Sequence, residues 1–231
     1  GAGGIKARLP ELRAARAAGM VAASICPDSG PFIGAFDPAD RQTAMTALRD
    51  LLDVAAEIGA AGVITPAAYG IHSNRLPPFT PPRPPEDDRG ILTEALATLG
   101  THAERLGVEL WLEPLNRYED HMVNTLAQGA DLCRASGSRA VRLMADLFHM
   151  NIEEADIPAS LRAAGPLVAH LPIPRAWNRA PATPTLLRPC RPCPILPAGG
   201  PSNAASPAPP IPPCPRPLPL CEGSPDGYPR P

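Results

Sequence analysis

Two acidic residues each follow a short apolar run that predicts a strand. In α/β enzymes, catalytic residues lie at such strand ends. Glu113 closes the run Val108-Glu-Leu-Trp-Leu, and Asp146 closes the run Ala140-Val-Arg-Leu-Met-Ala. Because parallel strands end at the same edge of a sheet, the two carboxylates can converge on one divalent cation. A pair of solvated acids at strand ends is the alternative, and the spacing alone does not separate these two interpretations.

More polar residues follow each of these acids. The loop after Glu113 contains Glu119, and His149 lies three residues beyond Asp146. Carboxylates and an imidazole above the ends of neighbouring strands form a cluster able to hold a metal or move a proton.

The elements that must position these residues alternate between strand and helix. Short apolar runs predict six strands, near 4–5 and at 20–25, 61–65, 108–113, 140–146 and 167–171. Repeated strand–helix units predict a parallel sheet, either closed as a barrel or open and doubly wound. No glycine-rich phosphate loop follows a strand, which disfavours a dinucleotide fold. We therefore expect an incomplete TIM (β/α)8-type barrel, with about six of its eight strands, one being absent before Gly1.

Helix boundaries are also readable from the sequence. Asp37-Pro38 predicts a helix start, and Gly59 predicts its end. Thr125-x-x-Gln128 predicts a capping box at the start of a later helix. The first of these helices places apolar residues on one face: Ala44, Leu48, Leu51, Leu52, Ala55 and Ile58.

Proline divides the chain into two parts. Of the 34 prolines in 231 residues, 14 lie in residues 1–171 and 20 in residues 172–231. The first part carries a net charge of −6 and the second a net charge of +4. Because proline donates no backbone hydrogen bond, the second part cannot continue a folded core. We expect a partial barrel over 1–171 and a disordered, Pro-rich or frame-shifted tail over 172–231.

The tail has two other interpretations. Its Pro-rich stretches could dock on SH3-like domains, and Cys190-x-x-Cys193 could form a metal or redox site. A frame-shifted end is favoured because the composition changes inside a folding unit.

Composition limits the partners. A formal net charge of −2 gives no reason to expect nucleic acid, and no apolar run reaches the length of a membrane span. His102 and His121 are expected to be ordinary surface or loop residues. No signal peptide is evident, so a cytoplasmic protein is expected.

The segment from Leu110 to His170 resembles the ketose 3-epimerases of the D-tagatose/D-psicose type, within the xylose isomerase-like barrels. The matching stretches are Leu112-Glu-Pro-Leu-Asn-Arg-Tyr-Glu119, Val123-Asn-Thr125, Met144-Ala-Asp-Leu-Phe-His-Met-Asn-Ile-Glu-Glu154 and Ala164-Gly-Pro-Leu-Val-Ala-His170. The resemblance implies a divalent metal, Mn²⁺ first with Mg²⁺ or Co²⁺ as alternatives, and a ketose substrate in a homo-oligomeric enzyme.

The resemblance also assigns roles. It makes Glu113 and Asp146 metal ligands, gives Glu113 a second role in moving the C3 proton, and places Glu119 and His149 on substrate oxygens. The third ligand belongs two residues after His170, where this chain has Pro172. The fourth, which is also the second acid/base, has no counterpart in the tail.

The expected chemistry follows from these residue types. Removing a proton beside a ketose carbonyl gives an enediolate, whose charge a metal can stabilise, and two carboxylates on opposite faces of C3 allow inversion. With two of four ligands absent, we expect this chain to be inactive. An aldose–ketose or hydroxypyruvate isomerase is the nearest alternative. An endonuclease IV-like repair enzyme and a non-catalytic Pro-rich binding module are alternatives of other classes.

Overall fold

The computed structural model of the chain describes residues 2–27, 30–72 and 80–172. Within them, five parallel strands form one sheet: β1 (Ser24–Ile25), β2 (Gly62–Pro66), β3 (Glu109–Glu113), β4 (Val141–Met144) and β5 (Val168–His170). The tail predicted from residue 172 lies, beyond Pro172, outside the described residues. The predicted boundary at 171–172 therefore stays a prediction.

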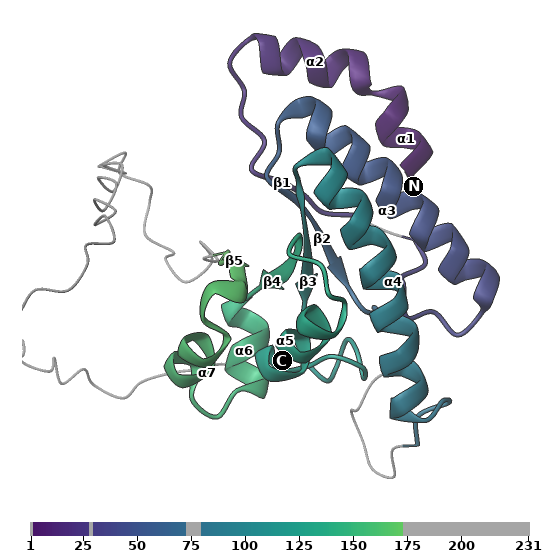
Figure 1. Ribbon diagram of the computed structural model, residues 1–231, viewed down its shortest axis with the longest axis vertical. Helices are drawn as coiled ribbons and strands as arrows, with labels where there is room; N and C mark the ends of the chain where they lie inside the picture. The colour runs from purple at the N-terminus through teal and green to yellow at the C-terminus, as the bar shows by residue number, and fades with distance from the viewer. Residues whose placement is uncertain (1, 28–29, 73–79, 173–231) are drawn as a thin grey trace, which may run out of the picture. The chain divides into compact units, whose positions relative to one another are not determined.

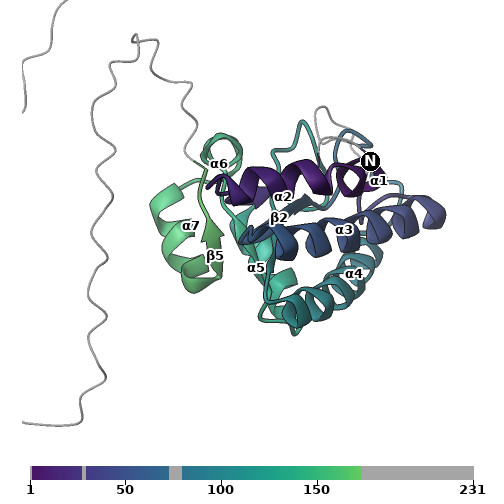
Figure 2. The ribbon, with the colours of Figure 1, turned by 90° about the horizontal axis from the view of Figure 1, so that it is seen from above.

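Seven α-helices and one 3₁₀ turn accompany the strands in the described ranges (Figure 1). They are α1 (Ala2–Ala7), α2 (Leu9–Ala17), α3 (Pro38–Ile58), α4 (Pro85–Leu106), α5 (Leu126–Ala135), α6 (Leu147–Glu153), α7 (Ile157–Ala164) and η1 (Gly165–Leu167). The long helices α3 and α4 lie side by side against the sheet (Figure 2). None of the helices in these ranges combines the length and apolar character needed to cross a bilayer.

The strand order decides between the two predicted architectures. The strands are neighbours in chain order, β1-β2-β3-β4-β5, and every pair is parallel. Crossovers between parallel strands are right-handed, so a sheet that never reverses its order places all connecting helices on one face. A doubly wound sheet reverses its order at a switch point, and this sheet does not. The arrangement is that of part of a TIM-type barrel.

The predicted helix boundaries are confirmed. The Asp37 carboxylate accepts a hydrogen bond from the backbone N–H of Ala39 at 2.7 Å. Gly59 ends α3 in the left-handed region with φ of 75°, which glycine adopts at little cost. Thr125 and Gln128 form the predicted capping box at the start of α5. The predicted apolar face of α3 is buried throughout.

Two strand predictions were wrong. Residues 4–5 belong to helix α1, not to a strand. The neighbouring alanines favour helix, and Ile5 gains its partial burial by packing against the core that α3 lines. The run 20–25 contributes only Ser24–Ile25, with Met20 and Val21 left exposed. The described part of the barrel thus has five strands instead of six.

The two faces of the sheet carry different side chains. Leu110 and Leu112 of β3 are fully buried in the core shared with the helices. Trp111 lies on the opposite face, where it packs with Ile64 and Met144 in a separate cluster. Because side chains alternate along a strand, Glu113 shares this second face with Trp111. The acid therefore belongs to the barrel interior and lies at its C-terminal edge.

Two glycines of α4 provide a matched test of the contact between this helix and β4. A Cβ at Gly100 would lie 2.6 Å from Ser138 Cβ and 2.6 Å from Val141 Cγ2, whereas a Cβ at Gly90 meets nothing within 4 Å. Gly100→Ala is expected to lower the free energy of unfolding by about 1–3 kcal/mol. Gly90→Ala is expected to raise it by roughly 0.5–1 kcal/mol. Urea denaturation measures both, and equal stabilisation by the two variants would contradict the close approach.

Candidate active site

The two predicted acids lie at the same edge of the sheet. Glu113 is the last residue of β3. Asp146 lies two residues beyond the end of β4 and caps helix α6, where its carboxylate accepts a hydrogen bond from the backbone N–H of Phe148 at 2.8 Å. The parallel pairing of β3 with β4 brings both carboxylates to the C-terminal edge, as the strand pattern predicted.

Helix α6 adds an imidazole to this edge. Glu113, Asp146 and His149 each offer a ligand atom, and these atoms all lie within 4.8 Å of one another. His149 Nε2 is 3.7 Å from Glu113 Oε1. Glu113 is 8% exposed and His149 is 7% exposed, so both side chains meet within the fold and not on its surface. We call these three residues the carboxylate–imidazole cluster.

The environment of Glu113 disfavours its charged form. Burial first, and then the nearby carboxylates of Asp146 and Glu119, together raise the pKa of Glu113 to about 7. A carboxyl group with a pKa near neutrality can both accept and return a proton, which suits a general acid/base. The same concentration of negative charge favours a bound cation.

The donor set fits a divalent cation. Two carboxylates and an imidazole are the ligand types that Mn²⁺ and related ions accept. Pro172 lies where the resemblance expects a third ligand and offers no side-chain donor. The described residues therefore supply two predicted ligands, Glu113 and Asp146, with His149 within reach.

Asn116 connects the two predicted substrate-binding residues, Glu119 and His149. Its backbone N–H donates to His149 Nδ1 at 3.2 Å, and its side-chain Nδ2 lies 2.9 Å from the same nitrogen. Nδ2 also donates to Glu119 Oε1 at 3.0 Å. The structure thus brings Glu119 and His149 together through a residue to which the sequence assigned no role. Its position between Glu113 and Glu119, directly after a strand, was the available signal.

Comparison with known proteins places this chain in a family. Residues 8–179 match the family described as xylose isomerase-like TIM barrel, which is most of the chain. The chain belongs to this family. The match extends past residue 171, and residues from 173 on lie outside the described part of the structure.

Relatives of this xylose isomerase-like barrel include sugar epimerases. The chain is 34% identical over 179 residues to 3-dehydro-D-guloside 4-epimerase of Escherichia coli (strain K12), a match covering 77% of this chain and 68% of that protein. It is 34% identical over 168 residues to D-psicose 3-epimerase of Enterocloster bolteae, covering 72% of this chain and 54% of that protein. The chain thus spans about two thirds of the first relative and about half of the second.

Solved structures similar to this chain also include sugar epimerases. The crystal structure of E. coli 3-keto-D-glucoside 4-epimerase in its apo form matches with a TM-score of 0.67 and 34% identity, over 71% of this chain and 63% of that chain. A D-psicose 3-epimerase crystallised in the presence of D-fructose matches with a TM-score of 0.61 and 27% identity, over 71% of this chain and 57% of that chain. The expected resemblance to sugar epimerases is confirmed, and it includes enzymes acting at carbon 4 as well as carbon 3.

Ion pairs fix the barrel's site-bearing loop against α6. Arg117 makes two side-chain hydrogen bonds of 2.9 Å to Glu153, and its backbone N–H donates to the same carboxylate at 2.7 Å. Glu154 accepts from the backbone N–H of Leu126 and from the Ser160 hydroxyl, both at 2.7 Å. The Arg117 contacts hold the loop of Asn116 and Glu119 against the helix that carries His149, and the Glu154 contacts join the end of that helix to α5 and α7.

Four further histidines of the described residues lie outside the cluster: His72, His102, His121 and His170. The ring of His170 stacks on Trp111, with centroids 4.8 Å apart. His102 Nε2 lies 2.8 Å from an Asp53 carboxylate oxygen on the helical side of the barrel. His121 lies in a loop, as expected, but its side chain is only 2% exposed and so is not an ordinary exposed loop side chain. Packing of its loop between α4 and the 66–72 segment buries this ring, and sequence spacing carries no signal of that.

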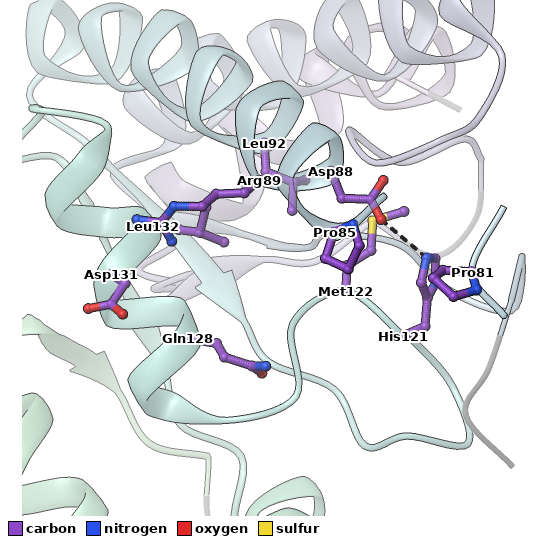
Figure 3. Close-up of a pocket in the computed structure, with 10 residues that line it drawn as sticks. All are labelled: Pro81, Pro85, Asp88, Arg89, Leu92, His121, Met122, Gln128, Asp131 and Leu132. Atoms are coloured by element: carbon purple, nitrogen blue, oxygen red, sulfur yellow. Dashed lines mark ion pairs between the residues drawn. The ribbon is translucent and has the colours of Figure 1, made fainter. Parts of the chain in front are cut away.

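A pocket lies near His121 (Figure 3). It is formed by α4, α5 and the loop before α5, and His121 Nε2 lies 3.4 Å from Asp88 Oδ2 at its edge. None of the three cluster residues lines it. The pocket and the carboxylate–imidazole cluster are therefore formed by different residues.

Proposed function

We propose that the chain carries the site of a metal-dependent sugar epimerase that moves a proton at the carbon beside a ketone. The carrying observation is the carboxylate–imidazole cluster, with a buried Glu113 whose pKa lies at about 7, at the C-terminal edge of a parallel barrel sheet. Catalytic groups of TIM-type barrels lie at this edge. The relatives named above are epimerases, which supports the same reaction class.

Each residue has a chemical role in this proposal. Glu113 removes the proton from the carbon next to the ketone and can return it, because its pKa is near neutrality. Glu113 and Asp146 hold the divalent cation, with Mn²⁺ the first candidate. When bound, such a cation stabilises negative charge that develops on the substrate oxygens. Glu119 and His149 hold those oxygens in place by hydrogen bonds.

The reacting carbon has two candidates. The motif from Leu112 to Glu119 resembles ketose 3-epimerases, which favours C3 of a free ketose. The 34% identity to a guloside 4-epimerase over 179 residues favours C4 of a 3-keto sugar. In both cases the proton lies next to a carbonyl, so Glu113 performs the same step. We take C3 as the primary proposal and C4 as the second. Cytoplasmic location and homo-oligomeric state stay predictions.

The 231-residue chain itself is expected to be inactive. Inversion needs an acid/base on each face of the reacting carbon, and the tail offers no counterpart of the second carboxylate. Pro172 also removes one ligand that the resemblance expects. With Mn²⁺ present, we expect no epimerisation of D-fructose, D-tagatose or a 3-keto glycoside above the background rate, as measured by chromatography of the sugars. Turnover by the purified chain would contradict this expectation.

A hybrid protein tests the proposed function directly. Residues 8–171 of this chain replace the corresponding residues of the E. coli 3-dehydro-D-guloside 4-epimerase, which then supplies the rest of the barrel. We expect the hybrid to epimerise a ketose or a 3-keto glycoside when Mn²⁺ is added and to lose that activity in EDTA. A folded hybrid that binds Mn²⁺ and turns over neither sugar would overturn the proposal.

A further inference from the structure

We infer that Asn116 is a positioning residue that holds the neutral His149 ring in its Nε2–H tautomer, so that His149 presents a donor to the site. In the proposed function this makes His149 a hydrogen-bond donor to a substrate oxygen and not a ligand of the cation. The inference rests on the proposed function for the identity of the acceptor. The tautomer itself follows from contacts among buried residues.

The amide of Asn116 has a fixed orientation. Its Oδ1 accepts a hydrogen bond from the backbone N–H of Tyr118 at 2.9 Å, and its Nδ2 donates to Glu119 Oε1 at 3.0 Å. Exchanging the amide oxygen and nitrogen would place oxygen against a carboxylate and an N–H group against another N–H group. Both contacts would then be repulsive, so only one orientation satisfies them.

This orientation determines which nitrogen of His149 carries the proton. The remaining N–H of Asn116 Nδ2 points at His149 Nδ1 over 2.9 Å, and the Asn116 backbone N–H points at the same atom over 3.2 Å. A proton on Nδ1 would face two donors. The neutral ring therefore keeps its lone pair on Nδ1 and its proton on Nε2.

The proton on Nε2 faces the carboxylate–imidazole cluster. Nε2 lies 3.7 Å from Glu113 Oε1, which leaves the N–H available to a third group between them. A nitrogen that carries a proton cannot coordinate a cation. Asn116 is 1% exposed, so these hydrogen bonds face little competition from water and are costly to break. The cation is then left to Glu113 and Asp146.

Nitrogen-15 NMR of the full 231-residue chain reads the tautomer without any activity assay. Two-bond ¹H–¹⁵N correlations of the imidazole rings distinguish Nδ1–H from Nε2–H, and His149→Gln identifies the signals of that ring. The spectra are recorded at about pH 8, above the ordinary pKa of a free imidazole. We expect His149 in the Nε2–H form. An Nδ1–H signal in the unsubstituted chain would overturn the inference, whatever the enzymatic outcome.

Asn116→Asp tests the cause of the preference. The substitution keeps the shape and the acceptor for Tyr118 N–H, but it places a carboxylate oxygen where the amide donor faced Nδ1. We expect protonation of Nδ1 to increase at least about tenfold relative to Nε2–H, because a charged acceptor replaces a donor. A folded variant whose ring stays in the Nε2–H form would show that Asn116 does not set the tautomer.

Asn124→Asp is the matched control. Asn124 lies in the same loop region, and its Nδ2 donates to the carbonyls of Leu115 and Asp120 at 2.7 and 3.0 Å without contacting His149. This variant tests whether the loss of other hydrogen bonds in the loop also changes the tautomer of the His149 ring. We expect its His149 signals to match those of the unsubstituted chain, and an equal shift in both variants would contradict a specific role of Asn116.

Discussion

Replacement of Glu113 by Gln in the hybrid protein is expected to lower kcat/KM for epimerisation by about 10³-fold or more. The amide cannot accept the substrate proton. The substitution also removes one negatively charged ligand from the proposed cation site. Because the Gln side chain has nearly the same shape, the fold around β3 should be retained. Steady-state rates at saturating Mn²⁺, with circular dichroism to verify folding, measure this effect.

Glu94→Gln is the control for the loss of one carboxylate. Glu94 is exposed on α4, outside the carboxylate–imidazole cluster, and we expect the rate of this variant to stay within about twofold of the hybrid, since surface substitutions have small effects. A Glu113→Gln hybrid as active as the Glu94→Gln hybrid would remove Glu113 from the mechanism.

The second large effect concerns the stability of the metal-free chain as a function of pH. Burial first, and then the nearby carboxylates, raise the pKa of Glu113 to about 7 from its ordinary 4.5. Between these values the folded chain retains a proton that the unfolded chain has released, so raising the pH favours unfolding. The stability that Glu113 contributes is complete below pH 4.5 and is lost as the pH rises to about 7. In total, this loss is on the order of 3 kcal/mol.

Urea denaturation in EDTA at about pH 5 and about pH 8 tests the effect by comparing the chain with Glu113→Gln. We expect Glu113→Gln to have the larger free energy of unfolding at the higher pH. We also expect its free energy of unfolding to fall less than that of the unsubstituted chain from the lower pH to the higher. Burial also raises the pKa of Asp120 to about 7 and lowers the pKa of His121. Both groups are present in the two proteins, so the difference isolates Glu113. Parallel pH profiles would show that Glu113 is not held in a disfavoured charge state.

The sequence predicted the elements whose signals are local. Apolar periodicity and end signals such as Asp37, Gly59 and the Thr125 capping box depend on neighbours within one turn, and these predictions are confirmed. The wrong strand at residues 4–5 shows where this reasoning fails. Ile5 is an isolated apolar residue in helix α1, and its packing against the core lined by α3 is a tertiary contact that no strand pattern in the sequence could show.

The candidate site was predictable for a similar reason. Strand direction alone places Glu113 and Asp146 at one edge, so their proximity follows from the order of β3 and β4. The hydrogen bonds of Asn116 to His149 connect residues 33 positions apart and depend on how α6 packs against the loop after β3. The burial of His121 likewise depends on tertiary contacts. No local pattern in the sequence contains that information.

Transfer of solvent deuterium to the sugar tests the central claim, proton removal by Glu113, most directly. The hybrid is incubated in D₂O with Mn²⁺ and either a ketose or a 3-keto glycoside, and proton NMR follows the signal of the carbon beside the ketone. We expect deuterium to enter at that carbon, and the Glu113→Gln hybrid to incorporate it at least about 10³-fold more slowly. Equal incorporation by the two proteins would contradict the assignment of Glu113 as the group that moves the proton.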